Sequence, residues 1–253
     1  MDGKIYDVGS LGGPFGQPYA FNNRGQIVGT SNLPGGQICH PFLWDKGVLT
    51  DLSTLGGETG FPNWINDRGV IAGKADLPGP APQNHDAVIW KNGEIVDLGT
   101  LPGDACANAY FVNSKGDVVG TSESNELCRV PTGEHAFLWK EGGPRQDLNM
   151  LIPPHSPLQL SFAVAINDRG TIAGFGVPPG CNPADVEVCG HPYVLIPCDA
   201  DPESECDKTS ADVAATSPVL SSLEKHNRNL QETCSCLTGI STGRVGSDPS
   251  ERV

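Results

Sequence analysis

The stretch that decides the fold is Ile65-Asn66-Asp67-Arg68-Gly69, because its Asn-x-x-Gly pattern occurs four times along the sequence. The first and last residues of the four copies are Asn22 and Gly25, Asn66 and Gly69, Asn113 and Gly116, and Asn167 and Gly170. Successive copies are separated by steps of 44, 47 and 54 residues. A recurring period of this length indicates a tandem-repeat protein.

Further shared features follow each copy of the pattern. A second glycine, preceded by an apolar pair, lies four residues after each turn glycine, at Gly29, Gly73, Gly120 and Gly174. An aromatic and aliphatic block comes next, and three of the blocks end in a tryptophan: Trp44, Trp90 and Trp139. The fourth block ends at Leu195 instead. The repeat therefore extends well beyond one turn.

Each unit is expected to form a four-stranded antiparallel meander. In the second unit we expect strands over residues 63–66, 70–74, 87–91 and 94–98. The Asn that opens the turn accepts a local backbone bond, and the Gly that closes it tolerates positive φ. Because the second strand of each unit is apolar at consecutive positions, both faces of each sheet should be covered. The predicted fold is therefore an all-β, β-propeller-like array of four blades.

The two ends of the repeat region complement each other. Residues 4–8 resemble the last strand of a unit, whereas no such strand follows Leu195 in the fourth unit. We expect residues 4–8 to pair with residues 193–195 and to close the ring. The alternative is that the chain is a fragment of a longer array. The predicted domains are a four-repeat domain over residues 1–197 and an acidic, cysteine-containing tail of low structure over residues 198–253.

The net charge and the cysteine content limit the possible binding partners and the cellular compartment of the protein. A formal net charge of −14 argues against nucleic acid or an anionic membrane as partner, and no apolar run is long enough for a transmembrane segment. Nine cysteines favour an oxidising compartment, so we expect an extracellular or surface protein. The first residues show no signal peptide, so either the signal peptide lies outside this chain or the expectation of export is wrong. We predict two disulfide bonds, Cys181 with Cys189 and Cys106 with Cys128. The two cysteines of each pair lie in loops at the same end of one unit.

Three motifs together resemble a known family. They are His-Ala-Phe-Leu-Trp at residues 135–139, Asp-Leu-Gly-Thr-Leu-Pro-Gly at residues 97–103, and Ile-Asn-Asp-Arg-Gly at residues 65–69 and 166–170. Over about residues 4–196 the chain resembles the bacterial extracellular repeats named HAF, after His-Ala-Phe. The resemblance implies a repeat fold and export or surface display, and it brings no catalytic residues. The chain departs from the pattern at Asp86, where the histidine is displaced to His85, and at Leu195.

Several ionisable residues recur with the repeat. His40, His135 and His191, with Asp86 in the second unit, form a metal-capable set, and a carboxylate recurs at Asp7, Asp51, Asp97 and Asp147. A residue that is repeated in every unit is expected to have the same structural role in each of them. We therefore assign both sets to structural bonds within or between repeats. An acidic run over residues 199–207 imitates a calcium loop but lacks its glycine and its final glutamate, so we predict no metal site and no cofactor.

Function is expected where the repeats differ. The connections between the second and third strands lengthen along the chain, over residues 31–39, 75–85, 122–134 and 176–190. The leading hypothesis is a non-catalytic module that binds a glycan, a protein or a surface polymer through these loops. Recognised nucleophile, metalloprotease and phosphate-loop motifs are not present in the sequence. The alternatives are a polysaccharide hydrolase or lyase, which needs only two placed carboxylates, and a purely structural surface module.

Overall fold

A computed structural model describes residues 3–79, 84–124, 135–181 and 186–198. The chain divides into two compact units, Met1–Thr216 and Ser217–Val253. The second unit lies outside the described residues, as do residues 199–253 of the predicted tail. The prediction of an all-β protein is confirmed for the described part of the chain.

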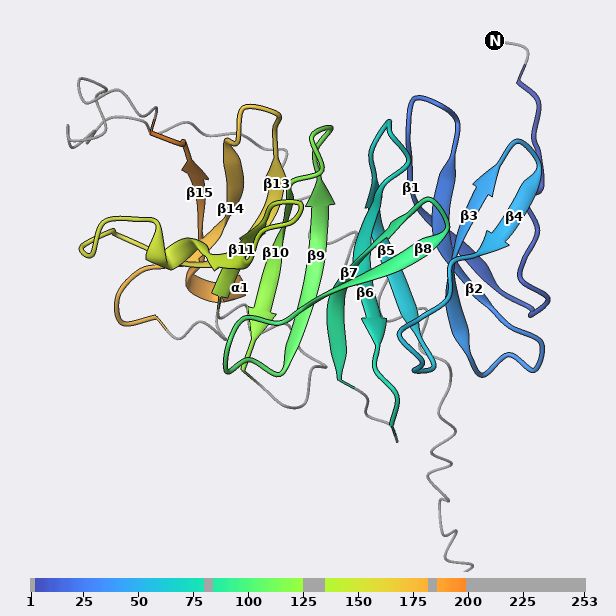
Figure 1. The fold of residues 1–253 in the computed structure, drawn as a ribbon, viewed down its shortest axis with the longest axis horizontal. Coiled ribbons are helices and arrows are strands. Elements are labelled where there is room, and N and C mark those ends of the chain that lie inside the picture. Colours follow the sequence, from blue (N-terminus) through green and yellow to red (C-terminus); the bar gives the residue numbers. More distant parts are fainter. Residues whose placement is uncertain (1–2, 80–83, 125–134, 182–185, 199–253) are drawn as a thin grey trace, which may run out of the picture. The chain divides into compact units, whose positions relative to one another are not determined.

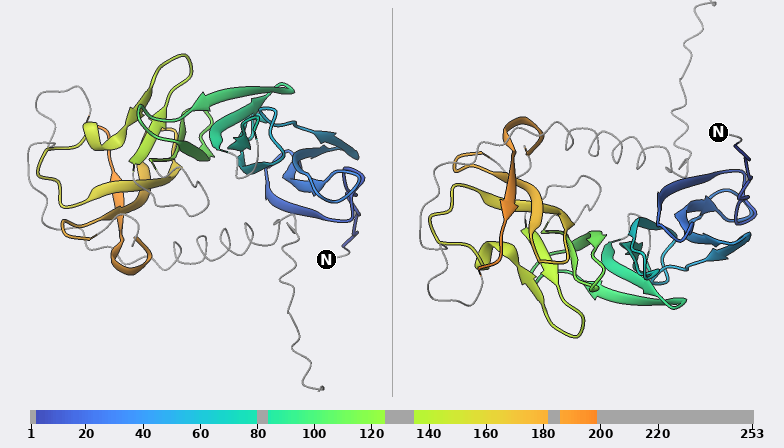
Figure 2. Two further views of the ribbon diagram at one scale, coloured as in Figure 1. Left: turned by 90° about the horizontal axis from the view of Figure 1, so that it is seen from below. Right: turned by 90° about the horizontal axis from the view of Figure 1, so that it is seen from above.

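The strands form antiparallel sheets that follow one another in chain order (Figures 1 and 2). The first sheet contains β1 (Gly16–Phe21), β2 (Ile27–Asn32), β3 (Cys39–Asp45) and β4 (Val48–Asp51). The second contains β5 (Gly60–Ile65), β6 (Ile71–Asp76), β7 (His85–Lys91) and β8 (Glu94–Gly99). The third contains β9 (Cys106–Val112), β10 (Val118–Glu123), β11 (His135–Trp139) and β12 (Arg145–Asp147). The fourth has three strands among the described residues, β13 (Gln159–Ile166), β14 (Ile172–Val177) and β15 (His191–Leu195).

Helical structure is confined to two short segments of the described chain. A 3-10 turn, η1 (Leu148–Met150), follows β12, and a four-residue helix, α1 (Val186–Cys189), precedes β15. Neither of these helices has the length and apolar character needed to cross a membrane.

The first strand of the second sheet begins earlier than the sequence predicts. We expected residues 63–66, whereas β5 begins at Gly60. Pro62 lies inside β5 opposite Gly73, next to a bulge at Asn63. Because proline cannot donate to a strand ladder and is common beside bulges, this part of the strand has a weak sequence signal.

Neighbouring sheets bury apolar side chains between them. Val28 of β2, Ile71 of β6 and Trp90 of β7 pack between the first and second sheets. In β10, Val118 faces the second sheet while the next residue, Val119, faces the fourth. Both faces of the inner sheets are therefore covered, which accounts for the consecutive apolar residues in their second strands.

A bulge and a glycine recur together in every sheet. The first strand of each sheet is bulged at the same place in the repeat, at Tyr19, Asn63, Tyr110 and Val164. Opposite this region lie the second-strand glycines Gly29, Gly73, Gly120 and Gly174. A Cβ atom at any of them would collide with a first-strand carbonyl oxygen and with one aromatic ring, from Phe42, Trp90, Phe137 and Tyr193 respectively. The glycine is therefore required by close packing from two sides.

The predicted pairing of residues 4–8 with residues 193–195 is wrong. Residues 4–8 form no strand, and β15 pairs only with β14 among the described residues. The segment that follows residues 4–8 is held at the first sheet instead, because Gly13 N donates to Asn32 O over 3.0 Å. The connection that follows residues 4–8 is thus bonded to the first sheet, while residues 4–8 themselves pair with no described strand of the fourth sheet.

Candidate functional site

The sheets present two different ends, which we call the turn face and the loop face. The turn face carries the connections between first and second strands, at residues 22–26, 66–70, 113–117 and 167–171. The loop face carries the connections from second to third strands and from each sheet to the next. Backbone bonds tie the connections between sheets to the ends of the second strands, as from Gly57 N to Asp76 O (3.0 Å) and from Ala105 N to Glu123 O (2.7 Å).

A ladder of buried asparagines crosses the turn face. Asn66 Oδ1 accepts from Arg68 N (3.0 Å) and Val70 N (2.9 Å), while its Nδ2 donates to Asn113 O of the next sheet (2.8 Å). Asn22 Nδ2 donates to Asn66 O (2.9 Å), and Asn113 Nδ2 donates to Asn167 O (3.1 Å). The first residue of the signature therefore folds its own turn and also bonds the next repeat.

The last residue of the signature completes the same turn. Its amide donates back to the carbonyl of the asparagine, over 3.0 to 3.2 Å. The four glycines all have positive φ: Gly25 (74°), Gly69 (83°), Gly116 (97°) and Gly170 (84°). A side chain with a Cβ is strained in this backbone region, which explains the glycine.

The turn face gains a further set of bonds between repeats. Asp67 accepts from the backbone and side chain of Asn23, and Asp168 accepts in the same way from Ser114. These hydrogen bonds hold the pKa of both carboxyls below its ordinary value. Much of the hydrogen-bonding capacity of this face is thus used within the chain.

The repeated histidines have three different surroundings. His40 Nδ1 lies 2.9 Å from Asp51 Oδ2 of the same sheet, and His135 Nδ1 lies 3.0 Å from Asp104 Oδ2 in the preceding loop. His191 is exposed. No group of three or more potential metal ligands occurs among the residues that the structure describes. The structure therefore does not assemble the metal-capable set that the sequence suggested.

The recurring aspartates act locally. Each accepts, through Oδ1, a hydrogen bond from the backbone amide two residues further on, over 2.7 to 2.9 Å. The pairs are Asp7 with Gly9, Asp51 with Ser53, Asp97 with Gly99, and Asp147 with Asn149. They shape the start of each connection between sheets and form no ring of carboxylates with one another.

The repeated tryptophans are not equally buried. Trp90 is 1% exposed and its Nε1 donates to Ser53 O over 3.3 Å, whereas Trp44 and Trp139 are half-buried. In the first and third sheets the fully buried ring belongs instead to Phe42 and Phe137, each two residues before the tryptophan of its sheet. The sequence pattern predicts no special role for these phenylalanines, although both blocks share the sequence Phe-Leu-Trp.

Asp86 is the most perturbed carboxyl on the loop face. Burial raises its pKa to about 6, and the charge of Asp97 and a hydrogen bond between the two carboxyls act in the same direction. Arg145, from the third sheet, opposes this shift. The fold thus holds Asp86 in its protonated form well above the pH at which an ordinary aspartic acid ionises.

Replacing Asp86 with asparagine should stabilise the protein at about pH 7.5 but not at about pH 4. The raised pKa means that protonated Asp86 favours the folded state below about pH 4, and that this contribution is lost as the pH rises through about 6. Asparagine removes the titration and can still donate to Asp97. Thermal unfolding at both pH values measures the difference.

The matched control is Asp168→Asn. The pKa of the Asp168 carboxyl is lowered in the folded chain, so this substitution should lower the stability at the higher pH. An equal effect of Asp86→Asn at both pH values would contradict the assignment.

A charged cluster lies where the second and third sheets meet the loop face. Burial lowers the pKa of Lys74, which the nearby carboxylates of Asp76 and Glu123 partly offset. Burial, and then the charge of Lys74, lower the pKa of His85, whereas burial raises that of Asp76. Lys74 thus lies near two carboxyl groups and near a histidine whose pKa is lowered, an arrangement that suits a structural cluster.

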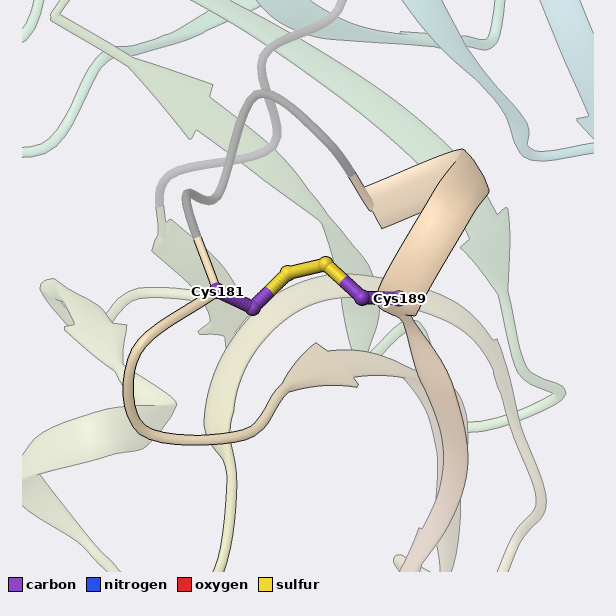
Figure 3. The surroundings of a disulfide bond; sticks show 2 residues. All are labelled: Cys181 and Cys189. Atoms are coloured by element: carbon purple, nitrogen blue, oxygen red, sulfur yellow. A yellow bond between two sulfur atoms is a disulfide. The ribbon is translucent and has the colours of Figure 1, made fainter.

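A disulfide between Cys181 and Cys189 braces the loop of the fourth sheet. It joins the loop that follows β14 to the end of α1, immediately before β15 (Figure 3). The predicted pairing of these two cysteines is therefore present. Cys106 is also disulfide-bonded, but Cys128, its predicted partner, lies outside the described residues.

The loop face contains a cavity of about 320 Å³ beside this disulfide. It lies between residues 149–159, from the connection of the third and fourth sheets and the start of β13, and residues 177–181, from the end of β14 and the loop after it. Its walls include Pro153, Pro154, Pro178 and Pro179, and none of the described residues that line it has an ionisable side chain. Most of its exposed lining is polar, and Asn149, Ser156 and Gln159 are its polar side chains.

The cavity wall is fixed by hydrogen bonds. Asn149 Oδ1 accepts from Leu160 N over 2.7 Å, and its Nδ2 donates to Leu160 O and to Asp147 Oδ1, both over 2.9 Å. Ser156 Oγ donates to Pro153 O over 2.8 Å. These bonds, the prolines and the disulfide restrict the conformations of the two segments that line the cavity.

Comparisons with known proteins identify no family for this chain. No protein-family model and no curated protein matches the chain. Among solved structures, it is similar to the Pyrococcus horikoshii acylaminoacyl peptidase in its orthorhombic crystal form, with a TM-score of 0.39 and 14% sequence identity. The similarity covers 72% of this chain and 26% of that one, so the chain spans about a quarter of the peptidase.

Proposed function

We propose that this chain is a non-catalytic, exported repeat module that binds an uncharged, hydrogen-bonding ligand, best matched by a neutral glycan, at the cavity on its loop face. The arrangement of its sheets is that of an open, propeller-like succession of blades. The single observation that carries the proposal is the preformed cavity between residues 149–159 and 177–181.

The chemistry of the cavity selects the ligand class. Its lining offers amides, a hydroxyl and backbone groups but no ionisable side chain. A ligand with a full charge would find no partner there and would lose its hydration, whereas hydroxyl and amide groups can exchange water for protein hydrogen bonds. A volume of about 320 Å³ falls at the lower end of the range of small-molecule sites.

The contrast between the two faces supports the same proposal. On the turn face the repeated residues bond one another, as Asn22, Asn66 and Asn113 do. On the loop face the connections differ from repeat to repeat, and the cavity forms at the longest described connection between sheets, residues 148–158. Binding residues carried by irregular loops on a rigid scaffold are a common arrangement.

Export is proposed on two grounds. The disulfide between Cys181 and Cys189 would be stable in an oxidising compartment. The recurring motifs, His-Ala-Phe at residues 135–137 among them, support membership of the HAF repeats, which implies secretion or surface display.

Filling the cavity should abolish binding. On an array of neutral and acidic glycans, we expect the wild-type chain to bind neutral members and Gln159→Trp to lose at least about tenfold in affinity, because the indole would occupy the cavity. The matched control is Gln146→Trp on β12, where the glutamine is also exposed but does not line the cavity. Binding of acidic glycans alone, or equal binding by both variants, would contradict the proposal. If the chain cleaved a bound glycan, it would be an enzyme and not a non-catalytic binding module.

A further inference from the structure

The segment that precedes β1 has the conformation of a connection between two sheets. Asp7 accepts from Gly9 N as Asp51 does from Ser53 N, and Ser10 Oγ donates to Gly13 O as Thr54 Oγ1 does to Gly57 O. Gly13 N bonds Asn32 O as Gly57 N bonds Asp76 O, each over 3.0 Å. Residues 7–13 therefore enter the first sheet as residues 51–57 enter the second.

The residues before this connection have the sequence of a fourth strand but no third strand beside them. In the three complete sheets the recurring aspartate lies at or near the end of the fourth strand and pairs with a third-strand residue, in the pairs Phe42–Asp51, Val88–Asp97 and Phe137–Asp147. The corresponding Asp7 follows Ile5 and Tyr6, which are 99% and 71% exposed. Two adjacent apolar side chains are thus left in solvent.

The fourth sheet has the complementary deficiency. Within the described residues, β15 bonds β14 on one side and no strand on the other. Tyr193 lies opposite Gly174 as Phe42 lies opposite Gly29, so β15 is in register with the third strands of the other sheets. Val194 on β15 is 66% exposed.

We infer that residues 4–8 of one copy of this chain add to β15 of a second copy as the missing fourth strand. The register of the complete sheets fixes the pairs as Asp7 with Tyr193, Tyr6 with Val194, and Ile5 with Leu195. The added strand satisfies the open edge of β15 and covers exposed apolar side chains on both strands.

Within one chain the first and fourth sheets lie at opposite ends of the row of sheets (Figure 2), so the donor is a second copy. The connection at residues 7–13 stays bonded to the first sheet of the donor chain. Leu11 N donates to Ser31 Oγ over 2.9 Å, in addition to the bond from Gly13 N. In the complete repeats, the sheet that contributes the fourth strand packs directly against the sheet that follows the connection, as the first packs on the second. The contact between copies would continue this stacking, with β15 of one copy beside β1 to β4 of the other.

Mixing two single-cysteine variants tests the pairing directly. Tyr6→Cys and Val194→Cys are oxidised under mild conditions, separately and together, with the wild-type chain as a control for the native cysteines. Facing residues of paired antiparallel strands are close enough for a disulfide to form. We expect a covalent dimer of one Tyr6→Cys chain and one Val194→Cys chain that appears only in the mixture and disappears on reduction.

Sedimentation of proline variants gives a second measurement. The wild-type chain should show a mass that increases with concentration, and Tyr6→Pro should remain a single chain because proline cannot donate to a ladder. Tyr6→Val, which places at this site the residue found at Val96 in the second sheet, should behave as the wild type. Two results would overturn the inference: no mixed dimer with all variants monomeric, or a Tyr6→Cys/Val194→Cys double variant that cross-links only within one chain. Neither result depends on the binding cavity.

Discussion

Gly120→Ala should lower the melting temperature by about 10 °C. The new Cβ would collide with the Asn108 carbonyl oxygen on one side and with the Phe137 ring on the other. Because both neighbours belong to strands of the same sheet, neither can move without breaking ladder bonds or opening the core. Overpacking of this kind costs about 3 kcal/mol, which corresponds to about 10 °C for a domain of this size. Thermal unfolding followed by circular dichroism measures the change.

Gly16→Ala is the matched control for this substitution. Gly16 lies in β1, has no positive φ, and its added Cβ would meet its nearest neighbour, Gly9 O, at 3.5 Å. That is ordinary contact, so the melting temperature should change by no more than about 2 °C. Similar melting temperatures for the two variants would show that the bulge and the aromatic ring do not require glycine at position 120.

Asn66→Ala should be comparably harmful, through lost hydrogen bonds. Asn66 is 6% exposed, and its removal leaves the amides of Arg68 and Val70 and the carbonyl of Asn113 without their partner. Several unsatisfied groups cost about 3 kcal/mol together. Denaturant unfolding measures the loss.

Two variants separate the roles of this asparagine. Asn66→Asp keeps the acceptor for the turn but cannot donate to Asn113 O, so it should lose the bond between sheets alone. Asn167→Ala removes an exposed copy whose printed bonds, from Arg169 N and Thr171 N, stay within its own turn. It should cost no more than about half as much as Asn66→Ala. Equal losses for the two alanine variants would show that the ladder between sheets adds nothing.

The sequence was sufficient to predict features that repeat. The turn asparagines and glycines, the four-unit division and the two-sided burial of the second strands all follow from local backbone demands or from periodicity. The aspartate at or near the end of each fourth strand could be predicted for the same reason, because its bond to the amide two residues further on is local.

Other features depend on contacts that no local pattern encodes. The bulge at Asn63 places the Phe61 carbonyl against Gly73, and only the folded register shows this. Residues 4–8 have the composition of a fourth strand, yet their position depends on which sheet holds residues 7–13. The cavity likewise forms from two irregular loops, whose mutual position depends on Asn149 and on the disulfide.

Hydrogen–deuterium exchange of the chain with and without a neutral oligosaccharide that it binds tests the central claim most directly. If the ligand binds in the cavity, protection from exchange should increase in residues 149–160 and 177–181, which surround it. Protection should not change in the turns at residues 22–26, 66–70 and 113–117. Protection confined to the turn face, or an oligosaccharide that binds equally well to the Gln159→Trp variant, would contradict it.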